Sequence, residues 1–263
     1  MIEIGIDPIL VTIGALSLSW HGLFMMAGIA TGVLLPARLV AKAELSVDRL
    51  YSIAVWAVPG GIIGARLVHV IDYWGYYSAN PASILAFWAG GLAIWGGILG
   101  GALTAIIFAR VKGFRLANYA DLIAPGLILA QAIGRIGCII YGDHTSTTTG
   151  LPWGVVYTHP NSPSSGLPPV HPAVAYELLM DLFILGVLWK LLGRIRPDGS
   201  LFLLYLILYS VGRFFLSFLR LDSNTVFLSL NQPQWLCLLV LAVSIPLMIV
   251  RWVSHRGQTS LES

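Results

Sequence analysis

Charged residues are scarce in this sequence. Of its 263 residues, 10% are Asp, Glu, Lys or Arg, whereas 57% are hydrophobic and the mean hydropathy is +0.82. A soluble domain carries roughly 25% charged residues. This chain cannot enclose so much apolar surface in one water-soluble core, so its composition excludes an ordinary soluble domain and indicates an integral membrane protein. Because backbone groups must be satisfied internally in lipid, we expect an all-α fold.

Long basic runs and a leader pattern are also lacking, and cysteines are few. No basic run is long enough for a phosphate backbone, so we expect no nucleic-acid partner. Cys138 and Cys237 match neither a metal nor a redox spacing, and we expect two thiols rather than a disulfide. The histidines of segment 142–172 also lack metal-ligand spacing, so neither a metal nor a cofactor is expected. The N-terminus MIEIGIDP lacks the basic region of a cleavable signal peptide, so the first hydrophobic segment should remain as an anchor.

Seven apolar stretches approach the roughly 20 residues that a membrane-spanning helix needs. They are 20–41, 50–71, 83–109, 119–141, 173–192, 199–219 and 233–252. The third is long and should tilt or break. Segment 8–18 is too short to span and should lie along the membrane interface. The sequence therefore predicts one transmembrane domain over residues 1–263, with seven transmembrane helices.

Lys and Arg alternate between the connections of these spans. Basic residues follow spans one, three, five and seven, and they are Arg38, Lys42, Arg49, Arg110, Lys112, Arg115, Lys190, Arg194, Arg196, Arg251 and Arg256. The opposite connections 1–19, 71–83 and 142–172 contain none, and only Arg220 lies toward their side. Because basic connections stay in the cytoplasm, we predict an external N-terminus, a cytoplasmic C-terminus and a long extracytoplasmic loop at 142–172.

Three arginines lie inside the predicted spans. Arg66, Arg135 and Arg213 each come late in a span that runs outward, so we expect them at a similar depth in the outer half of the membrane. A charge within a span is costly and usually faces the bundle interior or a wet cavity. Each could instead reach the outer headgroups or pair with a carboxylate. The candidates for such pairing are Asp72, Asp143 and Glu177.

Taken together, the three arginines favour a polar site that opens to the outer leaflet. Guanidinium groups bind phosphate in a bidentate manner, and the phosphate expected at that depth is a phospholipid headgroup. Arg213, Ser217 and Arg220 share one helical face, as do Gln131, Arg135 and Cys138.

Glycines accompany these polar positions. Gly96 and Gly97 should lie in the middle of the third span, where an opened helix could expose backbone N–H groups to a ligand. Gly100 and Gly101 repeat them four residues later, a spacing typical of close helix packing. Gly134 and Gly137 flank Arg135, and their small size should let a headgroup approach it.

The chain resembles the prolipoprotein diacylglyceryl transferase family, over nearly its whole length. The segments that carry the resemblance are 19–23 (SWHGL), 64–70 (GARLVHV), 88–98 (WAGGLAIWGGI), 131–138 (QAIGRIGC), 171–177 (HPAVAYE) and 212–220 (GRFFLSFLR). The resemblance implies an enzyme of the bacterial plasma membrane. It would transfer diacylglyceryl from phosphatidylglycerol to the lipobox cysteine thiol of a prolipoprotein, forming a thioether and releasing glycerol phosphate.

The resemblance also implies residue roles. Arg135 and Arg213 match the arginines that hold the lipid phosphate and stabilise the leaving group. Membrane lipid, phosphatidylglycerol and the lipobox peptide are the expected partners. The predicted substrate-binding residues are Arg66, Gly96, Gly97, Gly134, Gly137, Cys138, Ser217, Arg220, His171, Tyr176 and Glu177. For Tyr176 and Glu177, a structural role in tying loop 142–172 to the fifth span is an open alternative.

Five positions depart from the family pattern. The family has Tyr at His21, His at Trp95, Asn at Cys138, and Glu at both Asp143 and Ser217. An attacking thiol needs help in losing its proton, and tryptophan cannot accept one.

We therefore predict His21 as the catalytic base, with Asp143 or His144 as alternatives. The departures leave other functions open. These are a related transferase with another acceptor, a lipid-binding protein without activity, a secondary transporter, and a purely structural membrane protein.

Overall fold

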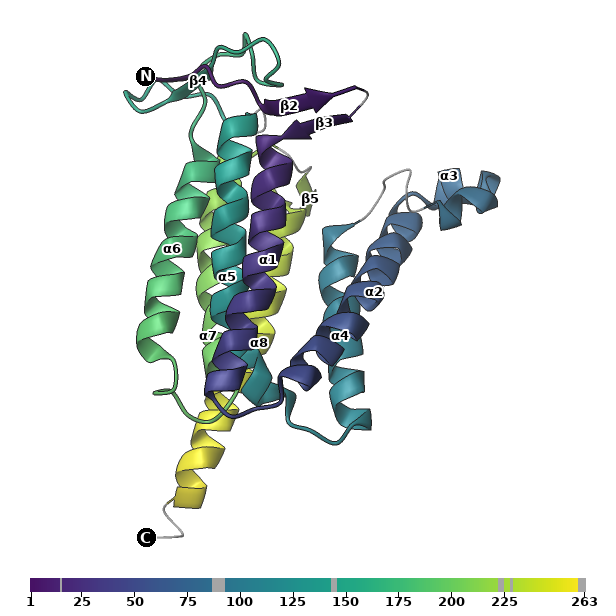
Figure 1. Ribbon diagram of the computed structural model, residues 1–263, viewed down its shortest axis with the longest axis vertical. Coiled ribbons are helices and arrows are strands. Elements are labelled where there is room, and N and C mark those ends of the chain that lie inside the picture. The colour runs from purple at the N-terminus through teal and green to yellow at the C-terminus, as the bar shows by residue number, and fades with distance from the viewer. Residues whose placement is uncertain (15, 87–92, 143–145, 222–224, 228, 260–263) are drawn as a thin grey trace. The chain divides into compact units, whose positions relative to one another are not determined.

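The computed structural model describes residues 1–14, 16–86, 93–142, 146–221, 225–227 and 229–259. Within these residues it contains seven helices of 17 residues or more, and each overlaps one predicted span (Figure 1). They are α1 (Trp20–Lys42), α2 (Val47–Asp72), α4 (Ile94–Val111), α5 (Leu116–Tyr141), α6 (Ala173–Leu191), α7 (Ser200–Leu216) and α8 (Gln232–Thr259). The prediction of a mostly helical chain is confirmed.

The third predicted span is broken, and its predicted start at 83 is wrong. The chain forms the short helix α3 (Trp74–Ala79) and the 3₁₀ helix η1 (Pro81–Leu85) before α4 begins at Ile94. Proline disfavours helical backbone in the residue before it, so Asn80 ends α3. Within the predicted span 83–109, η1 ends at Leu85 and α4 begins at Ile94, so the apolar run continues past a helix boundary that hydropathy does not register.

Over the described part of the chain, five helices are long and apolar enough to cross a membrane, namely α1, α2, α5, α8 and α7 together with the following 3₁₀ turn η3 (Ser217–Leu219). The apolar part of α4 is shorter. Helix α6 has 19 residues and carries Glu177, Asp181 and Lys190. The chain is thus a multi-pass membrane protein, whereas seven crossings and their orientation stay a prediction.

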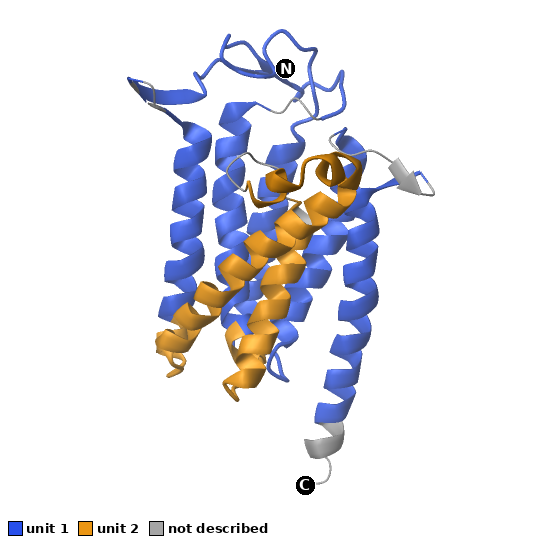
Figure 2. Cartoon of the chain, turned by 90° about the vertical axis from the view of Figure 1, so that its right-hand side faces the viewer, with its two compact units in different colours: residues 1–38, 120–263 blue, residues 39–119 orange. Residues whose placement is uncertain are grey.

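The chain divides into two compact units, which Figure 2 shows in different colours. Unit 1 comprises residues 1–38 and 120–263, and unit 2 comprises residues 39–119. Unit 1 therefore holds most of α1 and α5 together with α6, α7 and α8. Unit 2 holds α2, α3, η1 and α4.

In unit 2, glycines bring the backbones of α2 and α4 together. A Cβ atom on Gly64 or Gly96 would collide with the facing backbone, and one on Gly61 would lie 3.1 Å from the Gly97 carbonyl oxygen. Such contacts are typical of small residues spaced four apart in membrane helices. Gly96 and Gly97 lie in the first turn of α4 rather than at the middle of a helix. Close helix packing accounts for Gly96.

In unit 1, the core forms between α5, α6 and α7. Ile128, Ile184, Leu188 and Leu201 are buried there in one apolar cluster. Asp121 of α5 accepts hydrogen bonds from the backbone N–H groups of residues 199 and 202, at 2.6 and 2.8 Å, and so caps the first turn of α7. Apolar burial and this cap hold α7 in register with α5.

Strands cover one end of unit 1 (Figure 1). Strand β1 (Ile2–Ile4) pairs in parallel with β4 (Val155–Tyr157), and β2 (Ile9–Ile13) forms an antiparallel hairpin with β3 (Leu16–Ser19). These strands were not predicted. The pairing of β1 with β4 places the N-terminal segment and loop 142–172 at the same end of unit 1, as the predicted topology requires.

Loop 142–172 is folded over its described part. The backbone N–H of Thr147 donates to the Leu219 carbonyl at 2.9 Å, and that of His171 donates to the Thr147 carbonyl at 2.9 Å. Beyond η3, the short strands β5 (Thr225–Phe227) and β6 (Leu230–Asn231) lead into α8. The hydrogen bond between Thr147 and Leu219 ties the loop to the turn that follows α7, where several of the predicted site residues lie.

Candidate active site

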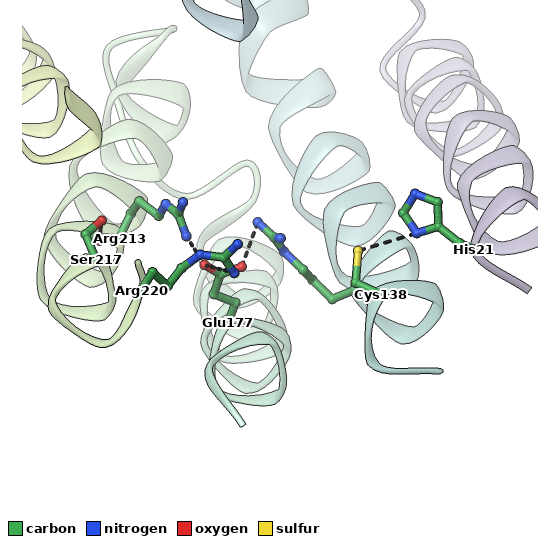
Figure 3. Close-up of polar contacts among 7 residues, drawn as sticks. His21, Cys138, Glu177, Arg213, Ser217 and Arg220 are labelled. Carbon is green, nitrogen blue, oxygen red and sulfur yellow. Dashed lines mark hydrogen bonds and ion pairs between the residues drawn. The ribbon is translucent and has the colours of Figure 1, made fainter. Parts of the chain in front are cut away.

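Glu177 lies among three arginines in unit 1 (Figure 3). Its carboxylate is 2.7 Å from an Arg135 guanidinium nitrogen and 3.8 Å from one of Arg220, and it also pairs with Arg213. The Glu177 side chain is 1% exposed, against 24% for Arg135, 15% for Arg213 and 12% for Arg220. Because a buried carboxylate is costly unless it is paired, these contacts explain why Glu177 can be buried here.

The helix directions bring the cluster together. Glu177 lies early in α6, whereas Arg135 and Arg213 lie late in α5 and α7. Helix α6 runs opposite to the other two, so the start of α6 meets their ends. Arg220 follows η3, where its backbone bridges to Ser146 of loop 142–172. The cluster thus sits at the end of unit 1 that the strands and the loop cover.

The cluster carries excess positive charge. Three guanidinium groups face one carboxylate, and guanidinium stays protonated in proteins. Arg135 is the most exposed of the three. The arrangement can therefore attract an anion with several oxygen acceptors, for which the fork geometry of arginine is suited.

His21 and Cys138 form a second polar contact. The thiol sulfur of Cys138 on α5 lies 3.6 Å from Nδ1 of His21, in the first turn of α1. A Cβ atom on Gly137 would lie 2.9 Å from the Cα atom of His21, and one on Gly134 would lie 3.3 Å from the Met25 sulfur. The two glycines therefore allow α1 to approach α5, which accounts for their small size. That they also admit a headgroup stays a prediction.

Ser217 has a backbone role next to the arginines. Its hydroxyl donates to the Arg213 carbonyl at 2.7 Å, and its own carbonyl accepts from the Asn231 side-chain amide at 3.3 Å. Asn231 and Gln234 in turn exchange side-chain and backbone hydrogen bonds at the start of α8. Ser217 thus links the end of α7 to α8, and substrate binding by it stays a prediction.

Tyr176 joins the loop to α6. The Trp153 indole N–H donates to the Tyr176 hydroxyl at 2.8 Å. The ring of His171 lies 6.5 Å from that of Tyr176, and its Nδ1 atom is buried without a hydrogen bond among the described residues. The structural alternative for Tyr176 therefore has direct support, because this contact holds the loop beside Glu177.

Several predicted site residues lie elsewhere. Arg66 belongs to unit 2, where its guanidinium donates to the carbonyls of Ser83 and Ile84, at 2.9 Å for Ile84, and lies 5.2 Å from the ring centre of Tyr77. Gly96 and Gly97 also belong to unit 2. That Arg66 shares a site with the other arginines stays a prediction. Asp143 and His144 lie outside the described residues.

Three other polar residues near the cluster were not predicted from the sequence. Asp181 follows Glu177 by four residues, and Tyr205 and Tyr209 precede Arg213 by eight and four. Tyr205 contacts Gln131 of α5, whose side-chain amide donates to the Tyr205 hydroxyl at 2.9 Å. The four-residue spacing was the available signal, since it places each of them on the same helix face as an ionic residue.

Known proteins match the chain over most of its length. The model of the family described as prolipoprotein diacylglyceryl transferase matches residues 8–250. A phosphatidylglycerol–prolipoprotein diacylglyceryl transferase of Dehalococcoides mccartyi is 38% identical over 252 residues, which are 95% of this chain and 96% of that protein.

Proteins of the same name from other bacteria also match. The one from Trichormus variabilis is 37% identical and covers 82% of this chain and 79% of its own. The one from Clostridioides difficile is 36% identical and covers 82% and 84%. The arginine cluster, the multi-pass helical fold and these likenesses agree, and the chain belongs to the prolipoprotein diacylglyceryl transferase family.

Proposed function

We propose that this protein transfers a diacylglyceryl group from phosphatidylglycerol to the lipobox cysteine thiol of prolipoproteins. The observation that carries the proposal is the buried cluster of Glu177 with Arg135, Arg213 and Arg220, whose excess positive charge suits a lipid phosphate. We place the enzyme in the bacterial plasma membrane with seven crossings and the cytoplasmic C-terminus that the basic connections predict. Loop 142–172 then faces the outer side, where lipobox peptides are presented.

The arginines would act on the leaving group. Arg135 and Arg213 bind the phosphate, and Arg220 adds positive potential. The acceptor thiolate attacks the glyceryl carbon, a carbon–sulfur bond forms, and the carbon–oxygen bond to phosphate breaks. Glycerol phosphate leaves with the bonding electrons, and the guanidinium groups stabilise its added negative charge. Fixed charges at the position where charge develops are often the largest contribution to catalysis.

The acceptor would dock against loop 142–172. The hydrogen bond from Trp153 to Tyr176 supports this, because it holds the described part of the loop directly over the start of α6. Glu177 is the next residue of that helix. A peptide bound on the loop would therefore present its thiol close to the phosphate-binding arginines.

His21 would take the proton of the acceptor thiol. Its contact with Cys138 supports this role, because an Nδ1–H that donates to the sulfur leaves the Nε2 lone pair as the proton acceptor. Cys138 is then a positioning residue for the imidazole. Asp143 is the alternative base.

Replacing His21 by Gln is expected to lower kcat by about 10²- to 10⁴-fold, the usual contribution of a general base. The residual activity should rise with pH as the acceptor thiol ionises unaided, and steady-state rates across pH would measure this. The matched control is His159→Gln, because His159 lies on the loop and pairs with Asp7 instead. An unchanged rate and pH profile for His21→Gln would assign the base elsewhere.

A reconstituted assay tests the function. Purified protein, phosphatidylglycerol vesicles and a lipobox peptide are combined, and mass spectrometry detects the diacylglyceryl adduct on the cysteine. We expect an adduct with the Cys peptide and none with a Cys-to-Ser peptide. Folded protein that binds the lipid but forms no adduct would contradict the standard acceptor and favour a related transferase with another one.

A further inference from the structure

A second polar layer lies beneath the arginines in unit 1. It consists of Gln131 on α5, Asp181 on α6, and Tyr205 and Tyr209 on α7. Asp181 interacts electrostatically with both tyrosines and with Arg135 of the layer above. Each member is four or eight residues along its helix from Arg135, Glu177 or Arg213 of the arginine cluster. Four residues advance a helix by about 6 Å. Gln131, Asp181 and Tyr209 therefore lie about one turn, and Tyr205 about two turns, farther from the end that the loop covers.

This layer contains hydrogen-bond acceptors that have no donor. Asp181 is 1% exposed, and neither of its carboxylate oxygens has a hydrogen-bond partner among the described residues. The Gln131 side-chain oxygen is also buried without a partner there. Buried polar atoms are nearly always satisfied, because an unmade hydrogen bond costs more than a made one contributes. Among the described residues, three acceptor atoms on α5 and α6 thus have no donor, and both side chains interact with Tyr205, which points to a guest that supplies donors.

We propose that this acceptor layer binds the two neighbouring hydroxyl groups of the glycerol headgroup, with Asp181 as the residue that determines headgroup specificity. The inference rests on the proposed function, because it takes the lipid phosphate to lie between Arg135 and Arg213. A glycerol unit on that phosphate extends over three carbons, which is enough to reach one helical turn deeper. Its hydroxyls are the donors that Asp181 and Gln131 lack.

The surrounding charge favours a diol over an ammonium headgroup. Three guanidinium groups belong to the arginine cluster, and among the described residues Glu177 and Asp181 are the carboxylates that interact with them. The net charge stays positive even with Asp181 ionised. A cationic headgroup would therefore be repelled from the position where two neutral hydroxyls are accepted. A buried water molecule could also satisfy Asp181, but it would not distinguish one headgroup from another.

Competition between two lipids tests the inference. Native mass spectrometry of the full chain would compare binding of phosphatidylglycerol with that of phosphatidylpropanol, which has the same phosphodiester and no hydroxyl groups. We expect wild-type protein to prefer phosphatidylglycerol by at least about tenfold, since a hydrogen bond to a charged acceptor contributes that much or more.

Asp181→Ala should bring the preference close to one, and Asp181→Asn, which keeps one acceptor oxygen, should lie between. Ser244→Ala, at a buried position of α8, is the control and should keep the wild-type preference.

The outcomes separate the alternatives. An unchanged preference in Asp181→Ala, an equal loss of both lipids, or stronger binding of phosphatidylethanolamine would overturn the inference. Loss of folding in both Asp181 variants would overturn it too, because a carboxylate without hydrogen bonds should not hold the fold together. If wild-type protein shows the headgroup preference but never forms an adduct, the proposed reaction fails and the headgroup site stands.

Discussion

Arg135→Ala and Arg213→Ala are each expected to abolish measurable diacylglyceryl transfer. Removing one preorganised charge that faces a developing anion costs about 10²- to 10³-fold in kcat, and each of these side chains would also hold the lipid in place. The two losses should not add, because both groups act on the same phosphate. The measurement is the rate of adduct formation on a lipobox peptide in phosphatidylglycerol vesicles.

Two further variants control this experiment. Arg135→Lys keeps the charge but loses the planar fork, so it should recover part of the activity at most. Arg251→Ala removes an arginine from α8 and should leave the rate unchanged. Each variant must also show the wild-type melting temperature within a few degrees, because Glu177 keeps at least two arginine partners after either single change. Full activity in both arginine variants would remove the basis of the proposed site.

Glu177→Gln should destabilise the protein strongly in neutral detergent. The change removes the negative charge among three guanidinium groups and leaves these partly buried cations facing one another. Breaking a buried ion pair by removing one partner typically costs about 3 to 5 kcal/mol. Thermal unfolding of the purified protein measures this effect as a lowered melting temperature.

An added anion should reverse the loss. Phosphatidylglycerol supplies a phosphate between the same arginines, so it should raise the melting temperature of Glu177→Gln more than that of wild-type protein. Phosphatidylcholine, whose phosphate is accompanied by a cation, should raise it less. Glu3→Gln, at an exposed carboxylate of β1, is the matched control and should change nothing. A Glu177→Gln variant with wild-type stability would show that the arginines do not depend on this carboxylate.

Glu177 also explains how the chain tolerates a departure at Ser217. The resemblance implies a carboxylate at position 217, four residues after the second arginine, and Ser217 cannot balance charge. Here the Ser217 hydroxyl bonds to the Arg213 carbonyl, while Glu177 pairs with the Arg213 guanidinium from a different helix. One buried carboxylate therefore pairs with three arginines. The cluster carries more positive charge than it would with a second carboxylate at position 217, and this charge can attract an anionic lipid.

The sequence by itself determined most of the helices and which arginines lie inside them. Long apolar runs predict helices because a lipid-embedded backbone must form its hydrogen bonds locally, and α1, α5 and α6 lie within a few residues of their predicted ranges. Arginine inside an apolar run is costly in any arrangement, so Arg135 and Arg213 were recognisable without a structure. The departures from the family pattern at His21 and Cys138 were also visible in the sequence, whereas the contact between these two side chains was not.

Only the tertiary structure decided which polar groups meet. The Glu177 cluster depends on how α5, α6 and α7 are rotated about their axes, and the Cys138–His21 contact depends on how closely Gly137 lets α1 approach. Rotation and approach are set by packing between helices, which hydropathy and spacing along one helix do not contain. Strand β1 likewise needs β4, some 150 residues away, before its backbone groups have partners. The four-residue spacing places Asp181 on the helix face of Glu177, but only the structure shows that its oxygens have no hydrogen-bond donor among the described residues.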